Sequence, residues 1–128
     1  MRLLLDTCTF LWAVREPEKL SSAAYGALAD PDNQRFISVV TVWEVAQKAG
    51  RDKLGFSLPI TEVFAKAERD LRLRCIPLDR AEALAIADLP LIHRDPFDRM
   101  LVCQAQVRGL TLVTPDEAIR QYEVLTLW

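Results

Sequence analysis

Acidic residues in this sequence stand where a bound metal ion could act on a phosphate group. Asp6 directly follows the apolar run at 3–5, and Asp116 follows a second apolar run at 110–114. In an open parallel sheet, ligands bind beyond the carboxyl ends of the strands, so acids that follow two such strands meet at one edge. Carboxylate oxygens are ligands that Mg²⁺ and Mn²⁺ prefer. These two acids therefore predict part of a metal site.

Further acids could reach the same place. Glu44 lies in a predicted helix after the second strand, and Asp95 and Asp98 open a later helix three residues apart, on neighbouring faces of its first turn. Carboxylates brought together repel one another, so the cluster implies a neutralising cation. A water bound to that cation could attack phosphorus, while the cation stabilises charge on the phosphoryl and leaving oxygens.

Each carboxylate taken singly also has a purely structural explanation. Asp6 and Asp95 each precede a predicted helix, where a carboxylate can accept backbone N–H groups. Thr41 with Glu44, and the segment 114–117, both fit capping boxes. Capping is the favoured explanation for Asp95, whereas the two explanations are evenly balanced for the other acids. The combination of the acids, and not any one of them, favours the metal site.

Short apolar runs alternate with helical patterns along the chain. Strands are predicted at 3–5, 35–38, 74–78, 110–114 and 124–127. Helices are predicted from 6 or 7 to before 17, from 21 or 22 to about 29, over 42–50 and 59–71, after a capping box at 79–82, over 96–109, and as a short turn starting at 115 or 116. The alternation indicates an α/β fold with a central parallel sheet of four to five short strands and helices on both faces.

Size and composition fit one domain spanning residues 1–128. The chain has 51% hydrophobic and 27% charged residues, as in an ordinary globular protein. No apolar run approaches the ~20 residues that span a bilayer, and Asp6 interrupts the N-terminal run before a signal-peptide core could form. We therefore expect a cytoplasmic protein with no membrane partner.

Histidine and cysteine usage narrows the chemistry. His93 is the only histidine, which excludes catalytic and metal sites built on several imidazoles. The three cysteines, Cys8, Cys75 and Cys103, are widely spaced and show no zinc pattern, so we expect small buried thiols. Oxygen ligands must then supply most of any metal site.

Four segments carry a resemblance to a known family over nearly the whole chain, in the order and spacing of that family. They are LLLDTCTFLWAV, ISVVTVWEVAQKAGRDKL, HRDPFDRMLVCQAQVRGLTLVT and PDEAI, of which the WE and DPFDRMLVCQA strings are specific. They resemble the PIN-domain ribonucleases, and within these the VapC-type toxins of type II toxin–antitoxin pairs. The resemblance implies a PIN-like three-layer sandwich and an endoribonuclease that uses Mg²⁺ or Mn²⁺ and leaves 5′-phosphate and 3′-hydroxyl ends.

The same resemblance assigns residues and partners. It implies metal-binding, catalytic acids at Asp6, Glu44, Asp98 and Asp116, with Asp95 and Thr114 as supporting residues. It gives Cys8 no catalytic role. It also implies a small antitoxin protein that blocks the site and a homodimer, for which apolar residues such as Phe10 and Trp12 on the first helix offer a surface.

An RNA substrate would need cations near the acids. The candidates for holding phosphates are Lys48, Arg51, Lys53, Arg94 and Arg99, although a solvated surface charge is the favoured interpretation of each. Trp43 could stack on a base, although burial in the core is the favoured interpretation. His93 is expected to be a turn or helix-entry residue.

Charge and motifs leave two other functions to weigh. A net charge of −2 is not typical of a nucleic-acid binder. If four carboxylates are metal ligands, however, the rest of the chain carries −2 + 4 = +2. A phosphatase of the haloacid dehalogenase type also begins with a strand and an aspartate, yet its DxDxT motif would need an acid at Cys8. A non-catalytic module that only binds a partner is disfavoured by the retention of all four acids.

Overall fold

The computed structural model describes residues 1–50 and 55–128. Within this part of the chain, five short strands form one sheet in the order β3-β2-β1-β4-β5, and all four pairings are parallel. The strands are β1 (Arg2–Leu5), β2 (Gln34–Ser38), β3 (Leu73–Ile76), β4 (Thr111–Val113) and β5 (Thr126–Leu127). The predicted parallel sheet is confirmed.

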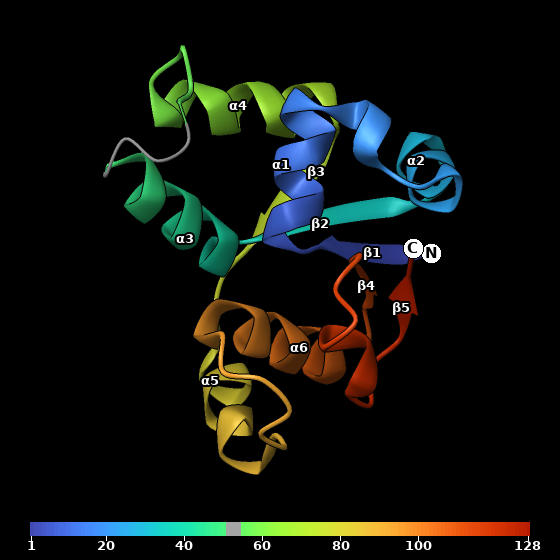
Figure 1. Cartoon of the computed structure of the whole chain (residues 1–128), viewed down its shortest axis with the longest axis vertical. Coiled ribbons are helices and arrows are strands. Elements are labelled where there is room, and N and C mark those ends of the chain that lie inside the picture. The colour runs from blue at the N-terminus through green and yellow to red at the C-terminus, as the bar shows by residue number, and fades with distance from the viewer. Residues whose placement is uncertain (51–54) are drawn as a thin grey trace.

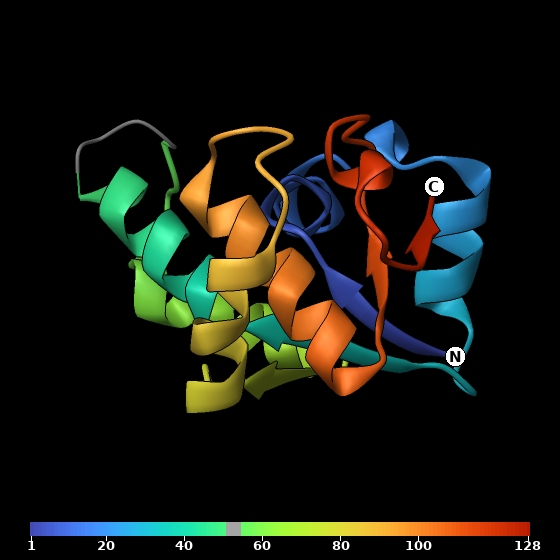
Figure 2. The same ribbon diagram turned by 90° about the horizontal axis from the view of Figure 1, so that it is seen from below.

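Helices cover both faces of the sheet and give three layers (Figures 1 and 2). On one face lie α1 (Thr7–Arg15), α2 (Ser22–Ala29) and α4 (Ile60–Asp70), and on the other lie α5 (Arg80–Ala85) and α6 (Pro96–Arg108). Helix α3 (Val39–Ala49) continues directly from the end of β2, and short 3-10 turns occur at Pro17–Lys19, Ile86–Asp88 and Ile119–Gln121. Among the helices of the described ranges, none has the length and apolar character needed to span a membrane.

The apolar run of β1 feeds the cores on both faces. Leu4 packs in a cluster with Leu101 of α6, whereas Leu5 packs with Phe10 of α1. Leu3, Leu4 and Leu5 have no exposed surface. Burial of each such side chain contributes roughly 1.5–3 kcal/mol, which explains why the strand is a continuous apolar run and not an alternating one.

The strand order fixes where a ligand can bind. β1 lies in the middle of the sheet, and the chain leaves it toward β2 on one side and later returns to β4 on the other. This change of direction is a topological switch point, where the loops that follow the two strands diverge and leave space for a ligand. The loops start side by side, because Asp6 N–H donates to the Val113 carbonyl at 3.2 Å.

Two element boundaries differ from the expected ones. Helix α3 begins at Val39, because the Ser38 hydroxyl accepts the Val40 N–H and caps it, so the capping box at Thr41 is wrong. The helix expected at 115 or 116 is also wrong. Asp116 carboxylate instead accepts the Ala118 N–H at 2.8 Å, and this turn delays helical structure to Ile119–Gln121.

The burial of some side chains also differs from the expected burial. Phe10 is wholly buried and stacks on Phe64 at 5.1 Å between ring centroids, so it offers no surface for a dimer. Cys103 is buried as expected, whereas Cys75 is exposed on the outermost strand.

Candidate metal centre

Asp6 lies at the end of β1 and is almost fully buried. One carboxylate oxygen accepts the Thr9 N–H at 2.7 Å and thereby caps α1, and the other accepts the Thr114 hydroxyl at 2.5 Å. Burial raises the pKa of Asp6, the bonds from Thr114 and Thr9 partly offset this rise, and repulsion by Asp116 adds to it. Asp6 is therefore both a helix cap and a carboxylate held in place for a further ligand.

Glu44 enters the same region from the second turn of α3 and is buried. The Thr7 hydroxyl donates to Glu44 Oε1 at 2.7 Å and lies 3.1 Å from the Thr41 hydroxyl. Lys48, one helical turn later, binds Glu44 Oε2 at 2.6 Å. Lys48, a candidate RNA contact, thus forms an ion pair with a candidate metal ligand.

Asp98 lies in the first turn of α6, which Asp95 caps. The Asp95 carboxylate accepts the N–H groups of Phe97 and Asp98 at 2.9 and 3.1 Å, which confirms the capping interpretation for this residue. The pKa of Asp98 is raised to about 7 by burial first, and then by repulsion from Asp95, Asp6, Glu44 and Asp116. The acids named from the sequence therefore act on one another electrostatically.

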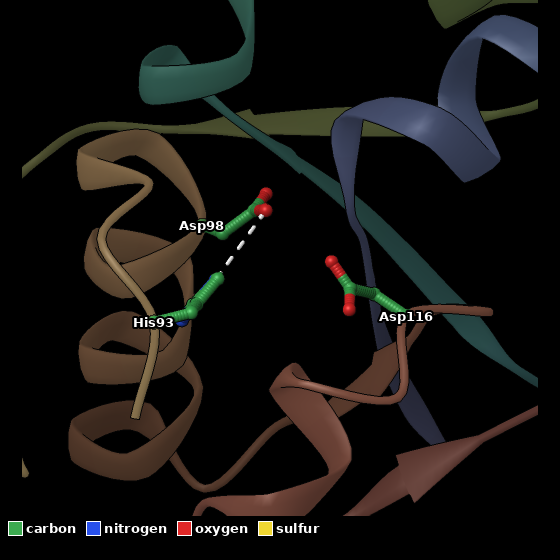
Figure 3. Close-up of side chains that lie close together, drawn as sticks. All are labelled: His93, Asp98 and Asp116. Atoms are coloured by element: carbon green, nitrogen blue, oxygen red, sulfur yellow. Dashed lines mark ion pairs between the residues drawn. The ribbon is translucent and has the colours of Figure 1, made fainter. Parts of the chain in front are cut away.

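Asp116 completes the group from the loop after β4. Its carboxylate faces Asp98 across a gap, with His93 beside Asp98 (Figure 3). One ligand atom from each of His93, Asp98 and Asp116 lies within 4.8 Å of the other two. Asp116 N–H donates to the Thr114 hydroxyl at 3.0 Å, so Thr114 links the Asp116 loop to Asp6.

The donor set fits a divalent cation that prefers oxygen. Carboxylates of Asp6, Glu44, Asp98 and Asp116 come from four separate elements, and of these acids Asp98 and Asp116 are the two that join His93 in the described group whose ligand atoms lie within 4.8 Å of one another. Burial first, and repulsion between the acids after it, raises the pKa of Asp6 and of Asp98, so these charges are costly to hold without a cation. A bound cation would remove that cost. Such a cluster can hold Mg²⁺ or Mn²⁺ with several waters next to a phosphate group.

Cys8 lies close enough to the acids to feel their charge. Burial, followed by repulsion from Asp6, Asp98 and Asp116, raises the pKa of its thiol to about 11. The thiol stays protonated at neutral pH and is a poor nucleophile, in agreement with its having no catalytic assignment.

The remaining candidate RNA-binding residues occupy different settings. Arg99 donates to the carbonyl oxygens of Leu89 and Pro90 at 3.3 and 2.8 Å and so braces the loop that precedes α6. Arg94 is exposed and lines a cavity of about 250 Å³ beside Trp43 and Phe97. The candidates Arg51 and Lys53 fall outside the described residues.

The expected burial of Trp43 is wrong. Its side chain is 62% exposed and meets the Phe97 ring edge-on at 4.9 Å. Trp12 is partly buried and packs on Trp128 at 5.8 Å. The exposed Trp43 ring is therefore adjacent to Glu44 in the sequence. It contacts Phe97 in the first turn of α6, the helix that carries Asp98.

Sequence reasoning missed three residues of the site. Thr7 directly follows Asp6, a position that could have indicated its role, and His93 is two residues from Asp95 in the segment HRDPFD. Tyr122, whose hydroxyl lies 2.8 Å from His93 Nδ1, has no local sequence signal.

Comparison with known proteins agrees with this geometry. The family model described as PIN domain matches residues 3–125. Among curated proteins, Ribonuclease VapC22 of Mycobacterium tuberculosis is 27% identical over 129 residues, which cover 98% of each chain. The match favours the PIN-domain interpretation over the haloacid dehalogenase alternative.

Solved structures share the fold at low sequence identity. A chain of VapBC2 from Rickettsia felis, solved bound to a promoter DNA fragment, superposes with a TM-score of 0.74 at 17% identity and covers 98% of this chain and 97% of its own. A chain of DNA-bound VapBC from Salmonella typhimurium gives a TM-score of 0.70 at 20% identity, covering 98% of this chain and 96% of its own.

Proposed function

Because the chain belongs to the PIN domain family, we propose that it is a metal-dependent endoribonuclease and the toxin of a toxin–antitoxin pair. The observation that carries this proposal is the approach of Asp98 and Asp116 to each other, with Asp6 and Glu44 close enough to raise the pKa of Asp98. The relative named as a ribonuclease supports the activity, and its match extends over almost the full length of both chains.

In the proposed mechanism, the carboxylates of Asp6, Glu44, Asp98 and Asp116 hold Mg²⁺ or Mn²⁺. When bound, the cation supplies an activated water for in-line attack on phosphorus and neutralises charge on the phosphoryl oxygens. The chain contributes fixed geometry: Thr114 orients Asp6, Thr7 orients Glu44, and the turn at Ala118 holds Asp116. Asp95 supports the site by fixing the first turn of α6.

RNA and an antitoxin are the proposed partners, with a second copy of the chain as a homodimer. The structural relatives are named as VapBC complexes, two of them bound to DNA, which supports an antitoxin partner. Lys48 and Arg94 lie close in sequence to the acids, and both leave part of their side-chain surface open to RNA phosphates. An antitoxin segment that covers the acids would block both RNA and metal-bound water.

A cleavage assay on structured RNA tests the proposed activity. Wild-type protein should cut with Mg²⁺ or Mn²⁺ and stop with EDTA, and Asp98→Asn should reduce the rate by roughly a hundredfold or more because a charge that holds the cation is lost. Mn²⁺ should raise the melting temperature of the wild type far more than that of Asp98→Asn.

Glu117→Gln is the matched control, because Glu117 adjoins Asp116 but is exposed and pairs with Arg120. It should cut RNA at the wild-type rate. An Asp98→Asn protein that also cuts at that rate refutes the assignment. A wild type that binds Mn²⁺ without cutting RNA supports instead a module that only binds its partner.

A further inference from the structure

His93 directs an unpartnered nitrogen into the acidic cluster. Its Nε2 lies 3.6 Å from Asp98 Oδ2, beyond hydrogen-bond distance, and Figure 3 shows the ring beside Asp98 and across from Asp116. Among the described residues this nitrogen has no hydrogen-bond partner, and it is shielded from solvent. A buried polar atom without a hydrogen-bond partner lowers the stability of the fold. The nitrogen is therefore a candidate for binding something that the protein alone does not supply.

The opposite side of the ring is held firmly. His93 Nδ1 lies 2.8 Å from the Tyr122 hydroxyl, which also accepts Arg99 Nη1 at 3.2 Å. Metal-binding histidines characteristically donate their other ring N–H to an oxygen, which fixes both the tautomer and the direction of the free nitrogen. In the tautomer with the proton on Nδ1, His93 donates to the Tyr122 oxygen, and the Nε2 lone pair is left for a ligand.

We infer that His93 Nε2 is a direct ligand of the cation, an inference that rests on the metal site proposed above. The ligand atoms of His93, Asp98 and Asp116 lie within 4.8 Å of one another. Ligand atoms bound to one small divalent cation lie about 3–4.2 Å apart, so direct binding by all three groups requires them to draw together by up to about 2 Å.

One imidazole among the carboxylates has a consequence for the choice of metal. Mg²⁺ prefers oxygen ligands and water, whereas imidazole nitrogen is a good ligand for transition metals. The His93 nitrogen therefore favours Mn²⁺ over Mg²⁺ at this site. Loss of the imidazole should weaken Mn²⁺ binding and leave Mg²⁺ binding nearly unchanged.

Pulsed electron paramagnetic resonance of the Mn²⁺-loaded protein tests the inference without RNA. Since the sequence contains one histidine, an imidazole nitrogen signal coupled to Mn²⁺ can come from His93 alone. The wild type should show ¹⁴N modulation that changes to the ¹⁵N pattern when only histidine is labelled with ¹⁵N. This comparison needs no substitution, so it does not depend on a variant that folds.

Variants extend the test. His93→Gln should abolish the imidazole signal and weaken Mn²⁺ binding by roughly tenfold or more, with a much smaller effect on Mg²⁺ measured by competition. Tyr122→Phe should retain the signal and weaken Mn²⁺ binding by roughly tenfold, because the ring loses its orienting oxygen. Glu117→Gln should change neither quantity.

Bound Mn²⁺ without a histidine nitrogen signal overturns the inference, and so does a wild type that fails to bind Mn²⁺. The outcome is separate from that of the cleavage assay. RNA cleavage without the nitrogen signal would leave the proposed function standing and remove His93 from the site. The nitrogen signal without RNA cleavage would support His93 as a metal ligand and contradict the proposed ribonuclease activity.

Discussion

Asp98 illustrates what the candidate site costs the metal-free fold. An unfolded aspartate has a pKa near 3.9, whereas burial and the neighbouring acids raise the pKa of Asp98 to about 7. The folded protein thus binds this proton more tightly than the unfolded chain does. The stability that follows is fully present below about pH 4 and is lost as pH rises through about 7.

This sign gives a prediction for the metal-free protein. In EDTA, the free energy of unfolding of the wild type should fall relative to that of Asp98→Asn between about pH 4 and 8, by about 2 kcal/mol after allowance for solvent screening. Above pH 7 the variant should be the more stable protein, because it lacks the repelled charge. Urea denaturation at several pH values measures both, and parallel pH dependences of the two proteins would contradict the prediction.

Trp43 gives a second residue-level prediction. Because its side chain is 62% exposed and packs only edge-on against Phe97, Trp43→Ala should cost about 1 kcal/mol of stability. A base stacked on this ring contributes about 1–3 kcal/mol, so the KM for RNA should rise roughly tenfold with little change in kcat.

Steady-state cleavage kinetics and a thermal melt on the same preparation separate the two effects. An unchanged KM would show that the exposed indole serves something other than RNA. Trp43→Phe, which keeps an aromatic face, should recover part of the lost affinity.

The positions of site residues that directly follow a strand could be predicted from the sequence. The burial of side chains that pack against distant segments could not. Asp6 and Asp116 follow apolar runs, so their positions at one edge of the sheet could be read locally. Phe10 is buried by Phe64 and Trp43 rests on Phe97, contacts made across more than 50 residues. No local pattern indicates such partners.

At the scale of elements, α6 connects two parts of the site. Its first turn carries Asp98, and its last turn leads through Gly109 into β4 and on to Asp116. Gly109 adopts a left-handed conformation with φ of 66°, and the following Leu110 N–H returns to the Ala105 carbonyl at 2.9 Å. Glycine reaches this conformation without the steric cost of a Cβ atom.

A pair of identical substitutions tests this helix end. Gly109→Ala should destabilise the protein by about 1 kcal/mol, because the left-handed backbone conformation is strained for alanine. A steric clash is not the cause, since a Cβ atom at this position meets nothing within 4 Å. Gly26→Ala, inside α2 and equally free of contacts, should stabilise it by about 0.5–1 kcal/mol because alanine is the better helix former.

Chemical denaturation gives both free energies on one scale. Equal signs for the two variants would contradict the role given to the left-handed turn. Gly109→Asn should lose less than Gly109→Ala, since asparagine tolerates the left-handed region better.

Element types followed from the sequence more closely than element boundaries did. The strands were readable because their apolar runs are buried on both faces of the sheet. The start of α3 was not, because Ser38 ends a strand and caps a helix in the same position. The turn at Asp116 was missed for a related reason: its carboxylate satisfies the Ala118 N–H in place of a helical turn.

At the scale of the whole molecule, large apolar side chains remain on the surface of the described structure. Trp43, Leu84 and Leu91 are each more than 60% exposed. Exposed apolar side chains can be covered when two copies of a chain associate. We expect light scattering at micromolar concentration to give twice the 14.5 kDa chain mass. A monomer mass throughout that range would contradict the homodimer, and addition of the antitoxin should raise the mass further.

The sheet order also determines when the acids can act during synthesis. Asp6 and Asp116 are separated by most of the chain, and β1 pairs with β4 only after both have left the ribosome. A nascent chain that ends before β4 already contains Asp6, Glu44 and Asp98, but it lacks β4 and the Asp116 loop that follows it. The proposed metal site therefore cannot form until β4 and Asp116 have been synthesised.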